Sequence, residues 1–121
     1  MVFERPFLQW MQERLQDLLP VFFEEADQTQ QEPFGVLQTI LTGATREVGM
    51  MRPLLQLDLY NADRFKVIEL AETVIGRIQF MDMASDGLFF SCLQAERSRP
   101  IRVEDGTWKV PIDIRFAVKA R

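Results

Sequence analysis

Apolar residues recur with helical spacing in the first part of the chain. Between Phe7 and Phe23 they fall three or four positions apart, and mainly glutamine, glutamate and aspartate lie between them. The pattern predicts an amphipathic helix that begins near Pro6, because proline suits a first helical turn. Pro20 is expected to end or kink this helix, since an interior proline removes a hydrogen bond. Residues 24–32 are polar and glutamine-rich, and we expect them to form a solvated connector.

Three segments have the composition of strands. Residues 34–41 are partly β-branched and bounded by turn residues, and residues 88–93 form a short apolar run. Residues 52–60 alternate, with leucines at 55, 57 and 59 expected on one face and Gln56, Asp58 and Tyr60 on the other. Between the first two predicted strands, residues 42–53 have no clear period and are predicted to be a long loop.

A second helix is predicted after residues 61–63, where Asn61 or Asp63 is suited to cap its first amide groups. A wide apolar stripe continues from there through Phe80, and charged side chains cover the remaining surface.

Strict alternation marks the end of the chain. Apolar and mainly polar residues exchange places from Val110 to Lys119, which predicts a half-buried strand. Pro111 has no amide proton to donate, so we expect an edge strand or a bulge there. Glu104, Asp105 and Gly106 are expected to form the turn of a hairpin that leads into this strand.

These elements predict a single α+β domain over residues 1–121. We expect the order α-β-β-α-β-β, with two helices packed on one face of a mainly antiparallel sheet. A chain of 121 residues with 47% apolar residues has material for one core.

Net charge and cysteine content limit the classes of partner that the chain can bind and the compartment in which it folds. The net charge of −4, with acidic and basic residues interspersed, argues against tight binding to nucleic acid or anionic lipid. The lone cysteine, Cys92, lies in an apolar run and is expected to be buried in a reducing compartment. The first residues include charges where a signal peptide needs an apolar core, and no apolar run is long enough to span a membrane. We therefore expect synthesis and assembly in the cytoplasm.

Residue types that catalysis commonly requires are scarce. The chain has no histidine, which removes the usual general base and the commonest metal ligand, and it has no glycine-rich phosphate loop. Glu24, Glu25 and Asp27, or Asp82 with Asp86, offer carboxylates for a hard cation, yet neither group has the ordered spacing of a calcium loop. We expect a protein that is not an enzyme, with no cofactor and no metal.

Two groups of residues are candidates for contacts with partners. Arg97, Arg99 and Arg102 follow the strand at 88–93, and they serve either an intersubunit or phosphate contact or a solvated loop. In the loop at 42–53, Met50 and Met51 either await a partner or fold back onto the core. Arg46 and Arg52 lie in the same loop and complete the set of candidate contacts.

The order of elements and several local sequences resemble the tail terminator, or tail completion, proteins of long-tailed bacteriophages. The similar pieces are the N-terminal helix, the strand entry at 33–36, the strand at 55–60 that runs into a helix, and the closing segment 105–116. The resemblance covers nearly the whole chain and rests on patterns rather than on signature residues.

This resemblance implies a structural virion protein that forms a hexameric ring. Such a ring caps the tail tube and joins the tail to the head through a head-side connector protein, and DNA passes its lumen without specific binding. The family has no catalytic residues to carry over. Two alternatives are another neck, collar or baseplate subunit, and a non-viral adaptor or ligand-binding domain of similar fold.

Overall fold

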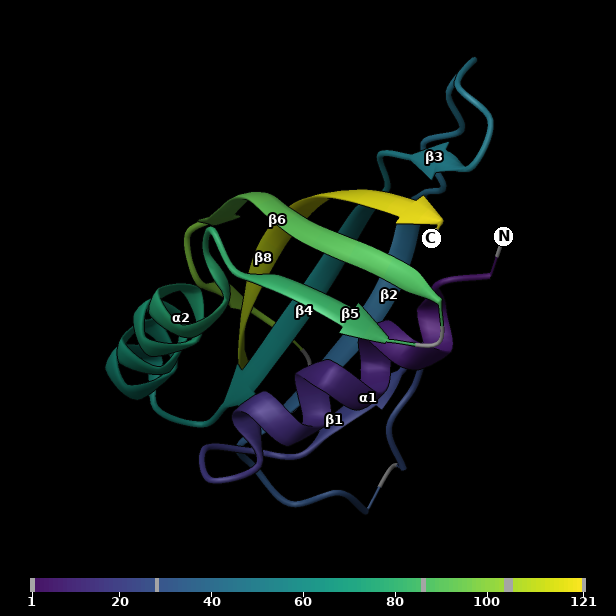
Figure 1. The fold of residues 1–121 in the computed structure, drawn as a ribbon. Helices are drawn as coiled ribbons and strands as arrows, with labels where there is room; N and C mark the ends of the chain where they lie inside the picture. The colour runs from purple at the N-terminus through teal and green to yellow at the C-terminus, as the bar shows by residue number, and fades with distance from the viewer. Residues whose placement is uncertain (1, 28, 86, 104–105, 121) are drawn as a thin grey trace.

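A strongly curled sheet of eight strands and two helices make up the described part of the chain (Figure 1). The computed structural model describes residues 2–27, 29–85, 87–103 and 106–120. In chain order the elements are α1 (Glu4–Leu15), β1 (Val21–Phe23), β2 (Phe34–Leu41), β3 (Met50–Met51), β4 (Leu54–Asn61), α2 (Arg64–Ile78), β5 (Asp82–Ser85), β6 (Leu88–Arg97), β7 (Ile101–Arg102) and β8 (Trp108–Ala120).

The strands lie in the order β1-β2-β4-β8-β6-β5, and the short strands β3 and β7 pair with the two ends of β8. The β1–β2 pairing is parallel, and the other pairings are antiparallel. The predicted fold, two helices packed on one face of a mainly antiparallel sheet in the order α-β-β-α-β-β, is therefore wrong, because the sheet is mixed, strongly curled and made of eight strands. Four strands were missed because β1, β3 and β5 are two to four residues long, too short to show a period, and because β7 was expected only as part of a hairpin.

The first helix is shorter than its apolar spacing predicted. It ends at Leu15, and Leu18 and Leu19 both donate backbone hydrogen bonds to the Leu15 carbonyl as the chain turns. Leu19 is still buried, so the core accepts apolar residues from the turn as well as from the helix. The segment after Pro20 is β-branched and aromatic, and it forms β1 beside β2.

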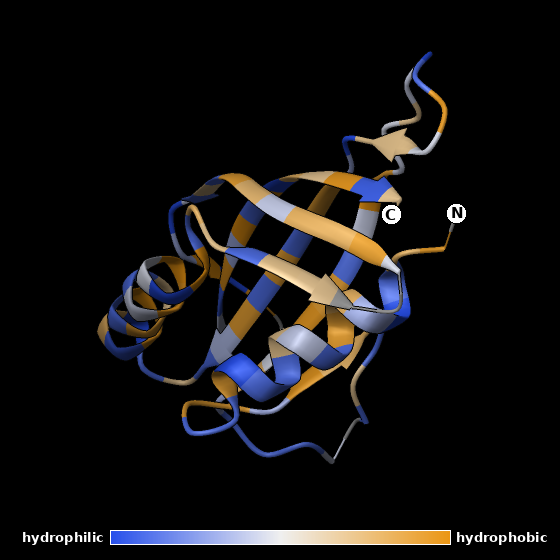
Figure 2. Ribbon diagram, viewed as in Figure 1, coloured by the Kyte–Doolittle hydropathy of each residue, from blue (hydrophilic) through white to orange (hydrophobic). Residues whose placement is uncertain are grey.

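The alternating segments supply the centre of the core. Five residues of β8 at every second position, from Val110 to Val118, are at most 1% exposed, as the sequence predicted. The leucines at 55, 57 and 59 of β4 are fully buried as well. Figure 2 shows the resulting bands of apolar and polar residues along the strands. Both helices contribute to this one core, with Phe7 of α1 packed edge-on against Phe116 of β8 at 4.4 Å between ring centroids.

Pro111 lies in a central strand and not at an edge of the sheet. Its carbonyl accepts from the amide of Ser98, the first residue beyond β6, at 2.9 Å. The nitrogen and carbonyl of one strand residue point to the same side. The missing amide proton therefore faces Ser98, where β6 has already ended, and not β4, so the proline falls where the pairing of β8 with β6 stops.

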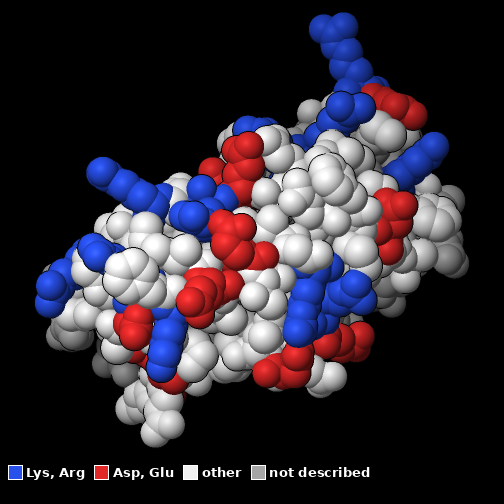
Figure 3. All heavy atoms as spheres, turned by 90° about the vertical axis from the view of Figure 1, so that its left-hand side faces the viewer, with Lys and Arg blue, Asp and Glu red and all other residues white. Residues whose placement is uncertain are grey.

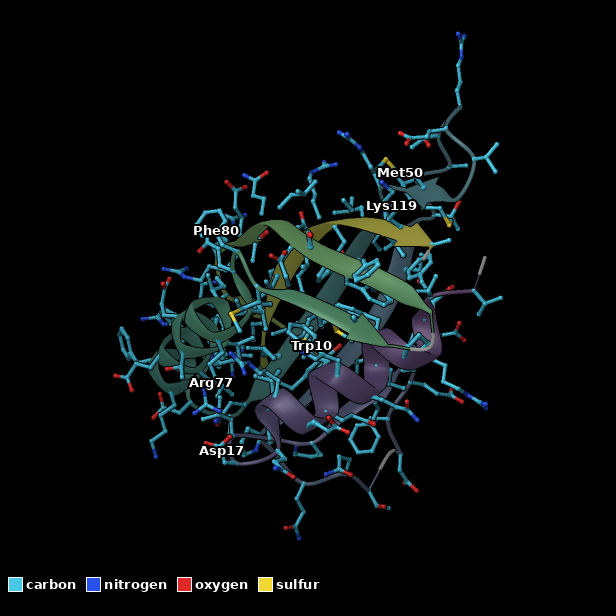
Figure 4. The ribbon with its side chains drawn as sticks, viewed as in Figure 1. Trp10, Asp17, Met50, Arg77, Phe80 and Lys119 are labelled. Carbon is cyan, nitrogen blue, oxygen red and sulfur yellow. The ribbon has the colours of Figure 1, made fainter. Side chains whose placement is uncertain are left out.

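The second helix begins where the sequence predicted. Asp63 caps it, and its carboxylate accepts from the amides of Phe65 and Lys66 at 2.9 and 3.1 Å. At the other end, Arg77 donates to the Asp17 carboxylate at 2.5 and 2.8 Å and to the Arg14 carbonyl at 3.2 Å. These hydrogen bonds connect the end of α2 to the last turn of α1 through Arg14 and to the segment after α1 through Asp17 (Figure 4).

Candidate interaction surfaces

The candidate contact residues fall at two opposite ends of β8. Arg46, Met50, Met51 and Arg52 belong to residues 42–53, which we call the arm, beside the end of β8 at Lys119. Arg97, Arg99 and Arg102 lie near its beginning, where Arg102 pairs with Trp108. The eleven residue steps between Trp108 and Lys119 correspond to roughly 35 Å of strand. The structure therefore does not bring the two groups together.

The arm projects from the sheet as an ordered hairpin (Figure 1). The backbone amide of Arg52 donates to the Gly43 carbonyl at 2.7 Å, and Ala44 forms a β-bridge with Met51. The backbone amide of Ala120 donates to the Gly49 carbonyl at 2.8 Å. Gly43 has a φ of +65°, and a Cβ atom there would lie 1.9 Å from the Arg52 carbonyl oxygen, so only glycine fits this crossing. The predicted long loop is thus structured by backbone pairing.

The two methionines of the arm fold back toward the body of the protein. Met51 packs against the core, and Met50 is half-buried and lies next to Lys119 (Figure 4). The apolar residues that the arm exposes are different ones. Val48 at its tip is fully exposed, and Leu41 at its base is 60% exposed. The exposed arginines Arg46 and Arg52 belong to the same projection.

Two of the three arginines at the other end have partners within the chain. Arg97 is the last residue of β6, and its Nε donates to the Glu72 carboxylate of α2 at 2.5 Å. The Arg102 guanidinium lies 5.8 Å from the centroid of the Trp108 ring, a cation–π geometry. Arg99 is exposed between the two strands. The alternative that all three arginines lie in a solvated loop therefore does not hold for Arg97, which is part of strand β6.

A second surface feature, which the sequence did not predict, is a hollow of about 380 Å³ on the outer face of the sheet. Its lining includes Glu24, Glu25, Asp27 and Glu32 from the segment between β1 and β2, and none of the described residues that line it is a lysine or arginine. Phe34 and Tyr60 also line it, and their rings stack at 4.8 Å with an angle of 15° between the planes. We call this feature the acidic hollow. The predicted solvated connector is thus one wall of a depression.

Hydrogen bonds fix part of the rim of the acidic hollow. The Thr107 hydroxyl donates to the Glu32 carboxylate at 2.5 Å. The Thr29 amide and hydroxyl donate to the Asp27 carboxylate at 2.9 and 2.8 Å, and these bonds lower the pKa of Asp27. Burial, and then the nearby Asp58 carboxylate, raise the pKa of Tyr60. Asp27 is therefore an anion and Tyr60 a neutral phenol at neutral pH.

The outer face of the sheet is buried at Asp58. This residue lies on the face opposite the leucines, as the alternation of β4 predicted, and it is 4% exposed between Val36 of β2 and Pro111 of β8. Its carboxylate accepts from the Gln56 side-chain amide at 2.7 Å. Alternation predicts which face a residue occupies but cannot show that another segment covers that face.

The structure gives no support to a metal site in the part of the chain it describes. Among the described residues, no cluster of three or more carboxylate or thiol side chains has the geometry to hold a metal ion. Asp86, one of the carboxylates considered from sequence, lies outside the described residues, as do Glu104 and Asp105 of the predicted turn. Cys92 is buried, and burial raises the pKa of its thiol.

Acidic and basic side chains alternate over the face of the molecule around α2. Figure 3 shows lysines and arginines beside aspartates and glutamates on this side, with no broad area of one sign. Such a surface has no basic stripe that would follow a nucleic-acid backbone. Within the described residues, no helix has the length and apolar character needed to cross a membrane.

Comparison with known proteins identifies the fold and no family. No protein-family model matches the sequence, and no curated protein matches it. One solved structure, which bears only a sequence identifier as its name, is similar over 98% of this chain and 92% of its own, with a TM-score of 0.69 and 18% identity. Another, a chain from the virion of a native gene transfer agent (GTA) particle, is similar over 91% of this chain and 84% of its own, with a TM-score of 0.57 and 12% identity.

Proposed function

We propose that this chain is a structural virion protein that forms a ring, caps a tail tube as a tail terminator and joins the tail to the head. The observation that carries the proposal is the likeness of nearly the whole fold to a chain from the virion of a gene transfer agent particle. The sequence resemblance to tail terminator proteins, which is independent of that likeness, gives the finer assignment.

The surface supports a role in assembly over a role in catalysis. The chain has no histidine, and its one thiol is buried with a raised pKa, so it lacks the side chains that most often act as base or nucleophile near neutral pH. Its distinctive features are instead a projecting arm and a hollow at opposite ends of the sheet. Two different surfaces at opposite ends suit a heterologous contact, which closes into a ring when the rotation between neighbours permits.

The partners in this proposal are further copies of the chain, the tail tube protein and a head-side connector protein. A hexamer would have a mass of about 85 kDa, six times the 14.1 kDa of one chain. The interspersed charge and the net charge of −4 fit a ring through which DNA passes without being held.

The test is the mass of the purified protein by light scattering after size-exclusion chromatography, alone and mixed with the tail tube protein encoded beside it. We expect a ring that co-elutes with the tube protein. A monomer under both conditions would contradict the proposal. A ring that binds other virion components but never the tube would place the chain at another position, such as a collar or baseplate.

A further inference from the structure

The two ends of the molecule differ in the sign of their charge. Among the described residues that line the acidic hollow, four carry carboxylates and none is basic; Asp27 and Glu32 accept hydrogen bonds from Thr29 and Thr107, which are neutral donors. The arm contributes Arg46 and Arg52, and Lys119 lies beside Met50 at its base, against one acidic residue, Glu47. Like charges held together repel each other unless a counter-charge joins them.

The geometry prevents one chain from joining its own two ends. Phe34 and Tyr60, at one end of the β2–β4 pair, line the hollow, and Leu41 and Leu54, at the other end of the same pair, lead into the arm. Phe34 and Leu41 are seven residue steps apart along β2, which corresponds to roughly 23 Å of strand. Exposed charges this far apart are largely screened, because the Debye length is about 8 Å at physiological salt.

The shapes of the two features also match. The arm is a hairpin with a fully exposed valine, Val48, at its tip, Arg46 in the bend beside that tip, and Arg52 at its base, opposite Gly43. The hollow has carboxylates around an apolar wall in which the stacked rings of Phe34 and Tyr60 and the side chain of Val36 take part. A tip of this kind would place its apolar residue against the rings and its guanidinium groups against the carboxylates. Lys109, the strand partner of Tyr60, and Arg102 lie near the hollow but outside its lining.

We infer that the acidic hollow of one copy receives the arm of the next copy, head to tail, so that this contact builds the ring. The inference rests on the proposed ring-forming function and adds the two surfaces that meet. The occupant is a second copy of this chain because the complementary charge and shape are present on the same protein, at the end that its own hollow cannot reach.

The test uses two charge-reversal variants, one in the arm and one in the acidic hollow. Arg46→Glu with Arg52→Glu makes the arm acidic and leaves the hollow acidic. Glu24→Lys, Glu25→Lys and Glu32→Lys together leave Asp27 as the remaining carboxylate of the four, so the hollow becomes basic while the arm stays basic. Each variant alone brings like charges together, and we expect the association between copies to weaken by at least about tenfold. An equimolar mixture restores opposite charges at both kinds of contact. We expect it to form alternating rings, which close when the number of subunits is even.

Matched controls carry the same change of charge elsewhere. Arg5→Glu with Lys66→Glu matches the arm variant, and Glu13→Lys with Glu69→Lys and Asp113→Lys matches the hollow variant. All of these are exposed residues outside both features, and we expect both controls to assemble like the wild type. Thermal melting of each variant shows whether it is folded. If a reversal variant does not fold, the neutral pairs Arg46→Gln with Arg52→Gln and Glu24→Gln with Glu25→Gln replace it, and each should weaken the ring and reduce its sensitivity to salt.

The outcomes separate this inference from the proposed function. Rings in the wild type and in the mixture, with neither folded reversal variant assembling alone, support the inference. Rings in each reversal variant alone, or no rings in the mixture of two folded variants, overturn it while the ring function stands. A wild type that forms no ring, alone or with the tube protein, removes the proposed function itself.

Discussion

At the scale of single residues, period-two alternation was the most informative signal in the sequence. It placed the inward residues of β4 and β8 correctly, because a strand turns successive side chains to opposite faces. It also placed Asp58 on the face opposite the leucines, but it did not show that Asp58 would be buried there. The period of a strand predicts the face of a residue and carries no information on how far that face is exposed.

Ile114 provides a test of the core. It is fully buried in β8 between Leu55 of β4 and Ala95 of β6. We expect Ile114→Ala to lower the free energy of unfolding by about 2–5 kcal/mol, because it removes buried apolar surface and leaves a cavity. Urea denaturation measures the change. The neighbouring exposed residue gives the control: Arg115→Ala should change stability by about 0.5 kcal/mol or less.

Cys92 provides a test of burial and of the raised pKa of its thiol. The side chain is 4% exposed, and burial raises its pKa, so thiolate is scarce near neutral pH. We expect a thiol reagent such as Ellman's reagent to label the native protein far more slowly than the urea-unfolded protein at the same pH. Equal rates in the two states would show that the thiol is accessible in the native fold.

At the scale of elements, the long periodic segments were predictable and the short ones were not. Both helices and strands β4 and β8 were identified from spacing, and β2 and the first part of β6 from composition. The first helix was extended too far because Leu18 and Leu19 continue its apolar pattern. β1 exists because β2 lies beside it, and β5 because β6 does. Pairing partners of this kind are a tertiary property, and so are the arm and the acidic hollow.

The link between the two helical segments is sensitive to acid. The hydrogen-bonded Arg77 guanidinium lowers the pKa of Asp17 from its ordinary value of 3.8. A carboxyl group whose pKa is lowered in the folded state stabilises that state above the unfolded pKa, and the stabilisation is lost as pH falls through the folded pKa. We expect Asp17→Asn to be less stable than the wild type near neutral pH. The difference should shrink as the pH falls from the ordinary pKa of 3.8 through the lower pKa of the folded state, as measured by urea denaturation across the pH range.

The arginines at the end of β6 and in β7 test a different element of the surface. We expect Arg97, Arg99 and Arg102, changed together to alanine, to leave the protein folded, because the Arg97–Glu72 pair is exposed and contributes little to stability. If these residues contact a neighbouring subunit or partner, assembly should be impaired, as read by chromatographic mass. Unchanged assembly would identify them as solvent-facing residues only.

At the scale of the whole molecule, the two ends of the sheet differ in shape and charge. An arm with exposed arginines and an exposed valine projects at one end, and a hollow bordered by carboxylates opens at the other. A protein with two unlike ends joins copies head to tail, whereas a symmetric dimer would need one patch that complements itself. Two unlike ends are what the proposed head-to-tail ring requires.

The most direct test of the ring is an image of the purified protein by negative-stain electron microscopy. We predict closed rings with six subunits around a central hole. Particles of the size of a single chain, seen both alone and in the presence of the tail tube protein, would contradict the account.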